Sequence, residues 1–300
     1  MSSYVAILSG GWSNEREVSL ITGAAVEGAL IESGYRVKLI DVGKDVSSLL
    51  TSLDPKPDVV FNALHGRYGE DGCIQGLLNY LDVPYTHSGV LASALAFNKP
   101  VAKAMMVAAG IKVAEHQLAT YEQFLDGNVM TPPFVVKPQN EGSSVGVRIV
   151  QVGDVFKPKK DEWVFGEELM IEKFIPGREL TVTVMGDRPL AVTEVITGRN
   201  FYDYDAKYIK GGSKHILPAE LPKVIYDEAL QISLLAHNSL KCRGISRVDI
   251  RYDGKNLYVL EVNTQPGMTP TSLAPEQAAY LNISFNELVI WLVENAVCDV

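Results

Sequence analysis

The first third of the chain alternates short apolar runs with segments of helical spacing. Apolar runs typical of buried strands occupy residues 4–8, 35–42 and 58–64. After the first run, apolar residues recur at the spacing of one helical face, at Val18, Ile21, Ala25 and Ala29. Gly34 is placed to end that helix, and residues 74–81 predict a second, short one. This strand–helix–strand order predicts a small, mostly parallel α/β domain, whose ligands would lie at the carboxyl ends of the strands.

Beyond residue 98 the pattern changes to strands joined by short turns. We expect strands at 133–137, 145–150, 168–175, 179–185, 247–252 and 257–263, and helices at 101–109, 222–240 and 284–296. The last two strands flank Asp253-Gly254 and read as a hairpin. Consecutive strands with short connections indicate antiparallel sheets, hence an α+β arrangement. Residues 200–214 are polar, aromatic and glycine-rich without a period, which predicts a long loop.

Composition narrows the classes of protein that the chain can be. Its 300 residues, 47% of them hydrophobic, suffice for two or three domains. The net charge of -9 argues against non-specific binding to nucleic acid or anionic lipid. The three cysteines are far apart and form no CxxC pair, so we expect neither a disulfide frame nor a zinc site. No stretch approaches the ~20 apolar residues of a membrane span, and a soluble, cytoplasmic protein is expected.

The predicted hairpin carries the most informative chemistry. Strand alternation puts Arg247 and Asp249 on one face, and Glu261 and Asn263 on one face of the partner strand. If the strands pair in register, Asp249, Glu261 and Asn263 converge as oxygen ligands of the kind that Mg²⁺ prefers. A solvated, charged hairpin face is the alternative interpretation. The apolar strands beside it, and Thr264–Met268 directly after it, favour a site.

Three further segments are weaker signals. Lys137 ends a predicted strand before a glycine- and serine-rich turn, an arrangement that can cradle phosphates, although such a turn is often structural only and the Walker A spacing is absent. Residues 172–175, with Glu179 beyond, offer an apolar hinge and a carboxylate for adenosine, or a plain strand and turn. Glu15, at the start of the first helix, suits a substrate ammonium better than a phosphate, or else it caps the helix.

Taken together, these segments resemble the D-alanine–D-alanine ligase family of the ATP-grasp superfamily. The matching segments occur in the family's order and cover nearly the whole chain: 10–19, 64–72, 88–94, 137–146, 201–208 and 247–268. The resemblance implies a three-domain ATP-grasp fold, with an N-terminal α/β substrate-binding domain (1–95), a central ATP-grasp domain (96–176) and a C-terminal catalytic domain (177–300). It also implies ATP-dependent ligation of two D-alanines through a D-alanyl phosphate, for peptidoglycan precursor synthesis.

The resemblance further implies roles for individual residues. The nucleotide contacts would come from Lys99, Lys137, Lys207 and Asn263, and from Glu172, Lys173, Phe174, Ile175 and Glu179 around adenosine. Two Mg²⁺ ions, with Mn²⁺ as an alternative, would be held by Asp249, Glu261 and Asn263. A hydrogen-bonded triad would join Glu15, Ser143 and Tyr208, while Arg247 and the N–H of Gly267 would face the oxyanion. Glu15 would bind the first D-alanine and Ser272 and Leu273 the second; Val18 and His65 are further substrate candidates, although His65 by default would be an ordinary loop histidine.

The sequence departs from the family pattern at three places. Asp205 stands where glutamate is frequent, Thr271 where histidine is frequent, and Gln265 where a smaller residue is usual. Two rival functions stay open. One is a different ATP-grasp ligase, including a version that accepts D-lactate, against which Tyr208 argues; the other is a nucleotide-binding module without turnover. A homodimer is implied by the family only, and no residue stands out as the base for the second amine.

Overall fold

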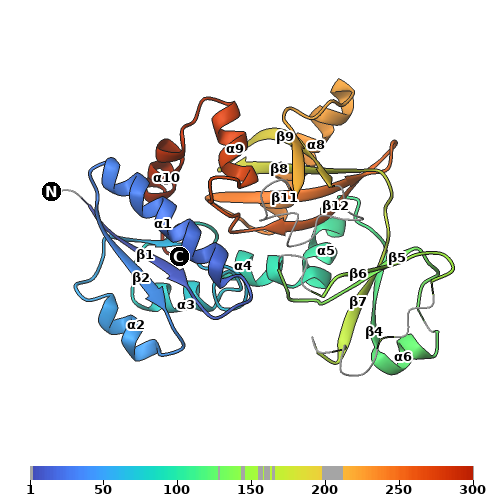
Figure 1. Ribbon diagram of the computed structural model, residues 1–300, viewed down its shortest axis with the longest axis horizontal. Coiled ribbons are helices and arrows are strands. Elements are labelled where there is room, and N and C mark those ends of the chain that lie inside the picture. The colour runs from blue at the N-terminus through green and yellow to red at the C-terminus, as the bar shows by residue number, and fades with distance from the viewer. Residues whose placement is uncertain are drawn as a thin grey trace.

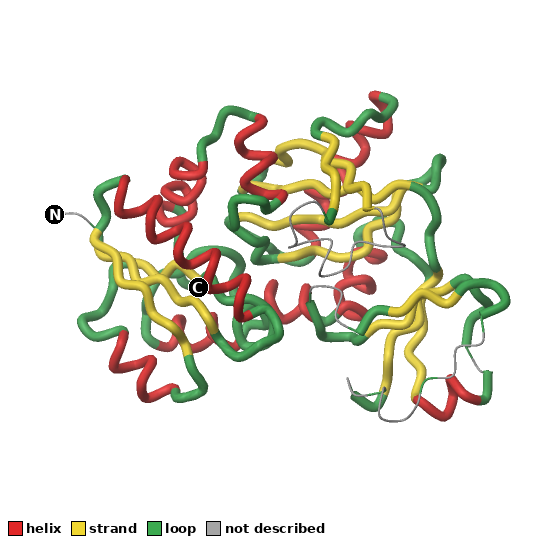
Figure 2. Tube along the Cα trace, in the orientation of Figure 1, coloured by secondary structure: helices red, strands yellow, loops and turns green. Residues whose placement is uncertain are grey.

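The computed structural model describes residues 3–127, 129–142, 146–154, 158, 163, 166–197 and 212–299. Its strands form three separate sheets, each with helices beside it (Figures 1 and 2). The mixed α/β and α+β fold expected from the pattern is confirmed.

The N-terminal sheet is parallel, in the order β2-β1-β3, and consists of β1 (Tyr4–Gly10), β2 (Arg36–Val42) and β3 (Val59–Asn62). Every residue of β1 is buried because helices cover both faces of the sheet. Val5 and Ile7 pack in one cluster, with Phe61 and with Leu288 and Leu292 from the end of the chain. Their neighbours in β1 pack on the opposite face.

The helices of this part are α1 (Arg16–Glu32), α2 (Val46–Ser52) and α3 (Cys73–Tyr80). Helix α1 begins and ends where the sequence predicts, with Gly34 at φ +83° just beyond it. The predicted buried face was wrong at one position, since Ile21 is exposed. The buried stripe runs instead through Val18, Thr22, Val26 and Ala29. The face that α1 turns toward the sheet is therefore rotated by about one residue from the predicted face.

The second sheet is antiparallel, in the order β4-β7-β5-β6, and lies apart from the first (Figure 1). Its elements are β4 (His116–Thr120), β5 (Phe134–Lys137), β6 (Arg148–Val150) and β7 (Glu168–Lys173), with the short helix α6 (Tyr121–Leu125). The strand predicted at 145–150 begins with a residue that lies outside the described residues; the strand that is described begins at Arg148.

The third sheet is antiparallel, in the order β10-β9-β8-β11-β12. Its strands are β8 (Arg178–Met185), β9 (Arg188–Thr197), β10 (Ser213–Ile216), β11 (Ile245–Tyr252) and β12 (Leu257–Asn263). The predicted loop 200–214 falls mostly outside the described residues, and its end was wrong, because Ser213 and Lys214 pair with β9 as strand.

One face of this third sheet is apolar and packs against helices. Leu180, Val182, Val248 and Ile250 share a cluster with Met106 and with α8 (Lys223–Ser239). Two helices before this region, α4 (Val90–Phe97) and α5 (Lys99–Ala108), meet at a bend of 104°. Helix α5 lies between the second and third sheets (Figure 1). The other face of the third sheet carries the polar side chains of the site.

The C-terminal helices return to the N-terminal sheet. Helices α9 (Leu273–Tyr280) and α10 (Phe285–Glu294) contribute to the cluster around Val5 and Ile7. Two elements far apart in sequence therefore close one core, and the N-terminal sheet cannot be buried on both faces without α10.

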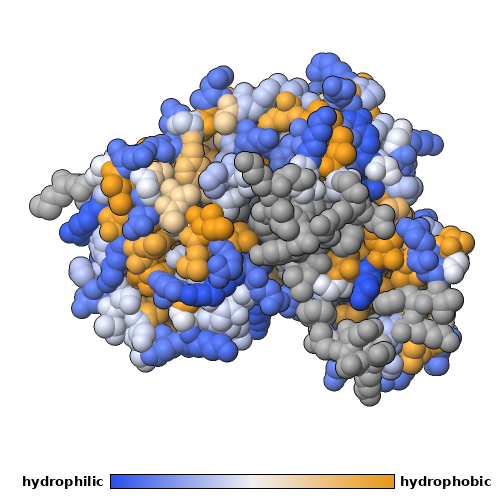
Figure 3. Space-filling model, viewed as in Figure 1, coloured by the Kyte–Doolittle hydropathy of each residue, from blue (hydrophilic) through white to orange (hydrophobic). Residues whose placement is uncertain are grey.

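The surface is mixed in character. Hydrophilic residues lie around most of the outline in Figure 3, with hydrophobic ones gathered over the N-terminal part, where Trp12, Ile21 and Ile31 are exposed. Within the described residues, no single helix is both long and apolar enough to cross a membrane, and only the bent pair α4–α5 reaches that length and composition together.

The start of α10 provides a test of this packing. Ser284 and Glu287 form a capping box, in which each side chain accepts from the other residue's backbone N–H. We expect Ser284→Ala to lower the free energy of unfolding by about 1 kcal/mol in urea titrations. Ser47→Ala, an exposed serine inside the first turn of α2, is the control and should have a much smaller effect; equal losses would contradict the assignment of the cap.

Candidate active site

The hairpin pairs in the register that the sequence predicts. Asp249 lies opposite Glu261 and Arg247 opposite Asn263, and a bulge follows between Asp249 and Ile250. All four side chains are partly buried on the polar face of the third sheet. The Nδ2 atom of Asn263 lies 3.1 Å from Oδ2 of Asp249. The predicted register is therefore confirmed, and Asn263 contacts Asp249.

Asp249 is held firmly from two sides. The guanidinium of Arg247 donates from Nε and Nη2 to the two carboxylate oxygens, at 2.9 and 2.8 Å. Thr181, opposite Asp249 on β8, donates its hydroxyl to Oδ1 at 2.8 Å. Arg247 and Asp249 are two residues apart on one strand, so their side chains share a face and form this fork.

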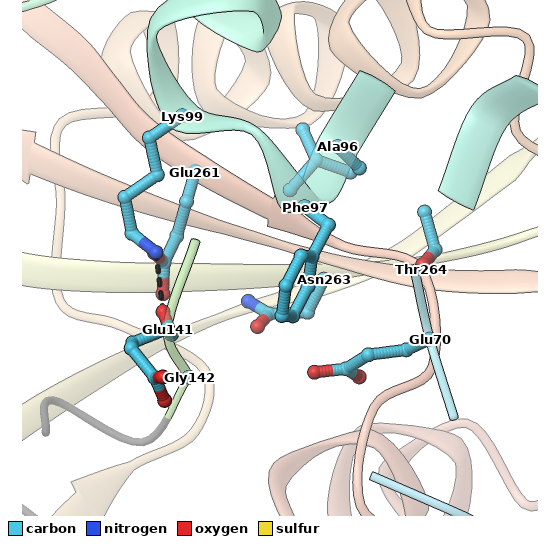
Figure 4. A pocket seen from close by; sticks show the side chains of 10 residues that line it. Glu70, Ala96, Phe97, Lys99, Glu141, Gly142, Glu261, Asn263 and Thr264 are labelled. Carbon is cyan, nitrogen blue, oxygen red and sulfur yellow. Dashed lines mark hydrogen bonds and ion pairs between the residues drawn. The ribbon is translucent and has the colours of Figure 1, made fainter. Parts of the chain in front are cut away.

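A pocket opens beside this face (Figure 4). Its polar lining comes from Glu70, Lys99, Glu141, Glu261 and Asn263. The Nζ atom of Lys99, at the start of α5, lies 3.8 Å from Oε2 of Glu261 and donates to the carbonyl of Glu141. Figure 4 shows the Glu70 carboxylate directed into the pocket from the opposite side.

Two carboxylates and one amide oxygen make a donor set suited to Mg²⁺. No group of three or more His, Cys, Asp or Glu side chains placed for a metal exists in the described parts of the chain. A third ligand would therefore have to be the amide of Asn263, and its oxygen and nitrogen can exchange places by rotation. The fit rests on Asp249 and Glu261 facing each other across the hairpin.

Glu15 reaches the same region from the N-terminal sheet. It lies 8% exposed at the N-cap position of α1, but its side chain makes no capping hydrogen bond. A Cβ at Gly66 would lie 2.7 Å from its Oε2, and a Cβ at Gly142 would lie 2.6 Å from it. The absence of a side chain at both glycines therefore lets the carboxylate lie directly against these two turns. Helix capping is therefore not its role.

His65 is buried beside Glu15. Its carbonyl accepts from the hydroxyl of Ser13, and its Nε2 lies 3.4 Å from the hydroxyl of Thr22. Burial lowers the pKa of the imidazole, although the charge of Glu15 opposes this shift. Val18, also a predicted substrate residue, is buried in α1.

Among the remaining nucleotide candidates, Lys137, Glu172 and Lys173 lie on strands of the second sheet, whereas Glu179 lies on β8 of the third. Lys137 Nζ lies 2.8 Å from Oε1 of the buried Glu172. In the hinge, the N–H groups of Lys173 and Phe174 donate to the carbonyls of Glu115 and Pro133. These two N–H groups are therefore bonded within the protein, which fixes the backbone of the hinge.

Arg251 ties that hinge to the hairpin. It donates to the carbonyl of Ile175 at 3.0 Å and to the Glu179 carboxylate at 3.2 Å. No role was predicted for Arg251; the alternation of β11, which puts it on the same face as Arg247 and Asp249, was the signal that could have suggested one.

The turn expected to hold the second substrate is closed by its own hydroxyls. The Ser272 hydroxyl accepts from the N–H of Thr269 and lies 2.7 Å from the Thr269 hydroxyl. Gly267 faces it, since a Cβ there would lie 3.0 Å from the Ser272 hydroxyl oxygen. Leu273 is buried at the start of α9. Gln265, one of the departures, is buried and bonds to Asn62 at 2.8 Å, joining the third sheet to the first.

Three predicted site residues, Ser143, Lys207 and Tyr208, lie outside the described residues, and so does Asp205. Sequence analysis missed Lys103 and gave Glu70 no role. Lys103 follows Lys99 by four residues on a helix, a spacing that marks a shared face, while nothing in the local pattern around Glu70 separates it from an ordinary loop acid.

Two antiparallel sheets beside a parallel α/β domain, with a pocket lined by Lys99 and acidic side chains, are the arrangement of ATP-grasp ligases. Family models for the D-ala D-ala ligase N-terminus and C-terminus match residues 46–88 and 100–294. The D-alanine–D-alanine ligase of Rhodospirillum rubrum is 55% identical over 100% of both chains, and that of Cereibacter sphaeroides is 56% identical over 98% of this chain and 96% of the relative. The crystal structure of D-alanine–D-alanine ligase from Bacillus anthracis complexed with ATP has a TM-score of 0.82 at 31% identity, covering 98% of this chain and 96% of that one. The chain belongs to the D-alanine–D-alanine ligase family.

Glu70 gives a pH-dependent prediction. Burial, together with the charge of Glu15, raises the pKa of Glu70 to about 8. The folded protein therefore holds a proton there that the unfolded chain releases near its ordinary pKa of 4.5. Wild-type stability should fall, relative to Glu70→Gln, as the pH rises from about 4.5 to about 8.

The measurement is urea unfolding of both proteins at several pH values. Glu228→Gln, which removes an exposed carboxylate on α8, is the control and should differ from wild type by a nearly constant amount. A constant difference for Glu70→Gln as well would contradict the raised pKa.

Proposed function

We propose that this protein joins two D-alanine molecules to D-alanyl-D-alanine at the expense of ATP, forming ADP and phosphate, for peptidoglycan precursor synthesis. The observation that carries this function is the partly buried hairpin face of Arg247, Asp249, Glu261 and Asn263. Two of these residues, Glu261 and Asn263, line a pocket that Lys99 also lines. Family membership over the whole chain supports the same reaction.

The reaction needs two steps because a carboxylate is a poor electrophile. The γ-phosphate of ATP passes to the carboxylate of the first D-alanine, giving an acyl phosphate, and the amine of the second D-alanine then displaces phosphate. We assign Lys99 and Lys137 to the ATP phosphates. Lys99 lines the pocket, and Lys137 lies on β5 of the second sheet. The ammonium group of a lysine is a compact positive charge that suits a phosphate.

We assign Mg²⁺ to Asp249, Glu261 and Asn263, where it would neutralise charge on the transferring phosphate. Glu15 would hold the ammonium of the first D-alanine, as a buried carboxylate with no capping role. Arg247 would stabilise the oxyanion of the second step. For this, its two hydrogen bonds to Asp249 would have to break or be shared with the oxyanion. Removing a donor of that kind typically lowers kcat by about 10²–10³.

We further propose that these tasks are divided among units 1–95, 96–176 and 177–300. A cytoplasmic homodimer stays a prediction from the family. The roles of Ser143, Lys207 and Tyr208 stay predictions as well.

ADP release tests the function directly. With Mg-ATP, D-alanine should stimulate ADP formation strongly and L-alanine should not, because the pocket must distinguish the two configurations of the substrate's α-carbon. The assay measures ADP against a panel of D- and L-amino acids and D-lactate, with dipeptide identified by mass. Equal rates for D- and L-alanine would refute the stereochemical assignment, D-lactate incorporation at the same rate would favour an ester-forming ligase, and nucleotide binding without ADP release would favour a binding module.

Removal of one proposed metal ligand gives a second test. Glu261→Gln keeps the size of the side chain but removes the negative charge that attracts Mg²⁺. We expect the Mg²⁺ concentration for half-maximal ADP release to rise at least about tenfold, in line with the effect of losing groups at a metal site. Glu228→Gln serves as the matched control, and an unchanged Mg²⁺ dependence of Glu261→Gln would remove Glu261 from the metal site.

A further inference from the structure

Three charged side chains are buried together beneath the nucleotide-binding region. Glu172 on β7 is 3% exposed, and its two carboxylate oxygens face different lysines. Lys137 Nζ lies 2.8 Å from Oε1, and Lys103 Nζ lies 2.7 Å from Oε2. Lys103 is 0% exposed. The cluster therefore contains two positive charges and one negative charge, sealed from solvent at the Lys103 end.

The three residues come from elements that meet at this point. Lys99 and Lys103 lie one helical turn apart on α5, between the second and third sheets (Figure 1). Lys99 reaches the pocket, whereas Lys103 reaches back to the middle of the second sheet. There Glu172 pairs with Val135 of β5 and His116 of β4, in the interior of the sheet. Its side chain is buried at that position.

The charges depend on one another. Burial by itself would raise the pKa of Glu172, but the two adjacent lysines lower it to about 2. Burial lowers the pKa of Lys103, and the carboxylate of Glu172 counteracts that shift. Breaking a buried pair by removing one partner is strongly unfavourable because the other charge is left uncompensated. Such a cluster needs a reason beyond stability, since apolar residues of similar volume are often as stabilising.

We propose that Lys103 is a positioning residue for ATP: by neutralising Glu172, it leaves the positive charge of Lys137 available to the nucleotide's phosphates. Without Lys103, the cluster is a one-to-one pair in which Glu172 cancels the charge of Lys137 and holds its ammonium against the sheet. With Lys103, one unit of positive charge remains, and Lys137, at 7% exposure, is the most exposed of the three side chains. The inference rests on the proposed contact between Lys137 and ATP.

The test compares Lys103→Met, Glu172→Gln and the double variant with wild type. Lys103→Met keeps an unbranched chain but removes the charge, and we expect it to raise KM for ATP at least tenfold while KM for D-alanine stays within twofold. The double variant removes the uncompensated carboxylate too and should recover most of that loss. Lys112→Met, which removes an exposed lysine bonded to Asn256, is the control and should retain the wild-type KM for ATP.

Several results would overturn the proposal. An unchanged KM for ATP in Lys103→Met would contradict it. A fall in kcat alone that adding Glu172→Gln does not reverse would also contradict it, because that result is expected for a lysine with a purely structural role. If Lys103→Met does not fold, Glu172→Gln and the double variant decide: their KM values for ATP should agree within threefold, and a tenfold difference contradicts an action through Glu172. Absence of D-alanine-dependent ADP release in wild type would instead refute the proposed function, independently of these ratios.

Discussion

The site depends on the register of β11 between its two neighbouring strands. Asp249 faces Glu261 of β12 on one side and Thr181 of β8 on the other. Because side chains alternate along a strand, a shift of one residue would turn Asp249 into the apolar core and bring Val248 or Ile250 to the pocket. The buried contacts of Val248 and Ile250 with α5 and α8 residues prevent that shift. The hydrophobic face of β11 thus fixes the position of the polar face, and the chemistry follows from the packing.

The same principle explains how distant segments reach one pocket. Glu15, His65 and Glu70 all follow strands of the parallel sheet, and such strands end at a common edge. That edge is held against the third sheet by the buried bond between Asn62 and Gln265. A buried amide pair is satisfied only in one relative placement, so the pair of Asn62 and Gln265 adds a geometric constraint between the two sheets.

Much of this arrangement could be predicted from the sequence, and the failures have physical causes. The hairpin was predictable because alternation in residues 247–263 encodes its faces, and its turn contains Asp253-Gly254. Strand β9 was not predicted, since its residues are buried on both sides and do not alternate. Ile21 was assigned to the wrong face because helical spacing gives a stripe but not its exact direction toward the sheet. The ion pairs of Lys103 and the raised pKa of Glu70 result from tertiary burial, which no local pattern records.

The charges that line the pocket bear on the form in which the nucleotide binds. Among the described residues that line it, Glu70, Glu141 and Glu261 are acids and Lys99 is a cation. ATP is an anion, so bare nucleotide would be repelled from the carboxylates opposite its phosphates. Protonation of Glu70, favoured by its raised pKa, removes one of these charges near neutral pH. A divalent cation between Asp249 and Glu261 would reverse the local sign, and the lysines at the second sheet would supply the rest. An acidic pocket of this kind thus favours a metal–nucleotide complex over free nucleotide, because the carboxylates attract the metal that the phosphates carry.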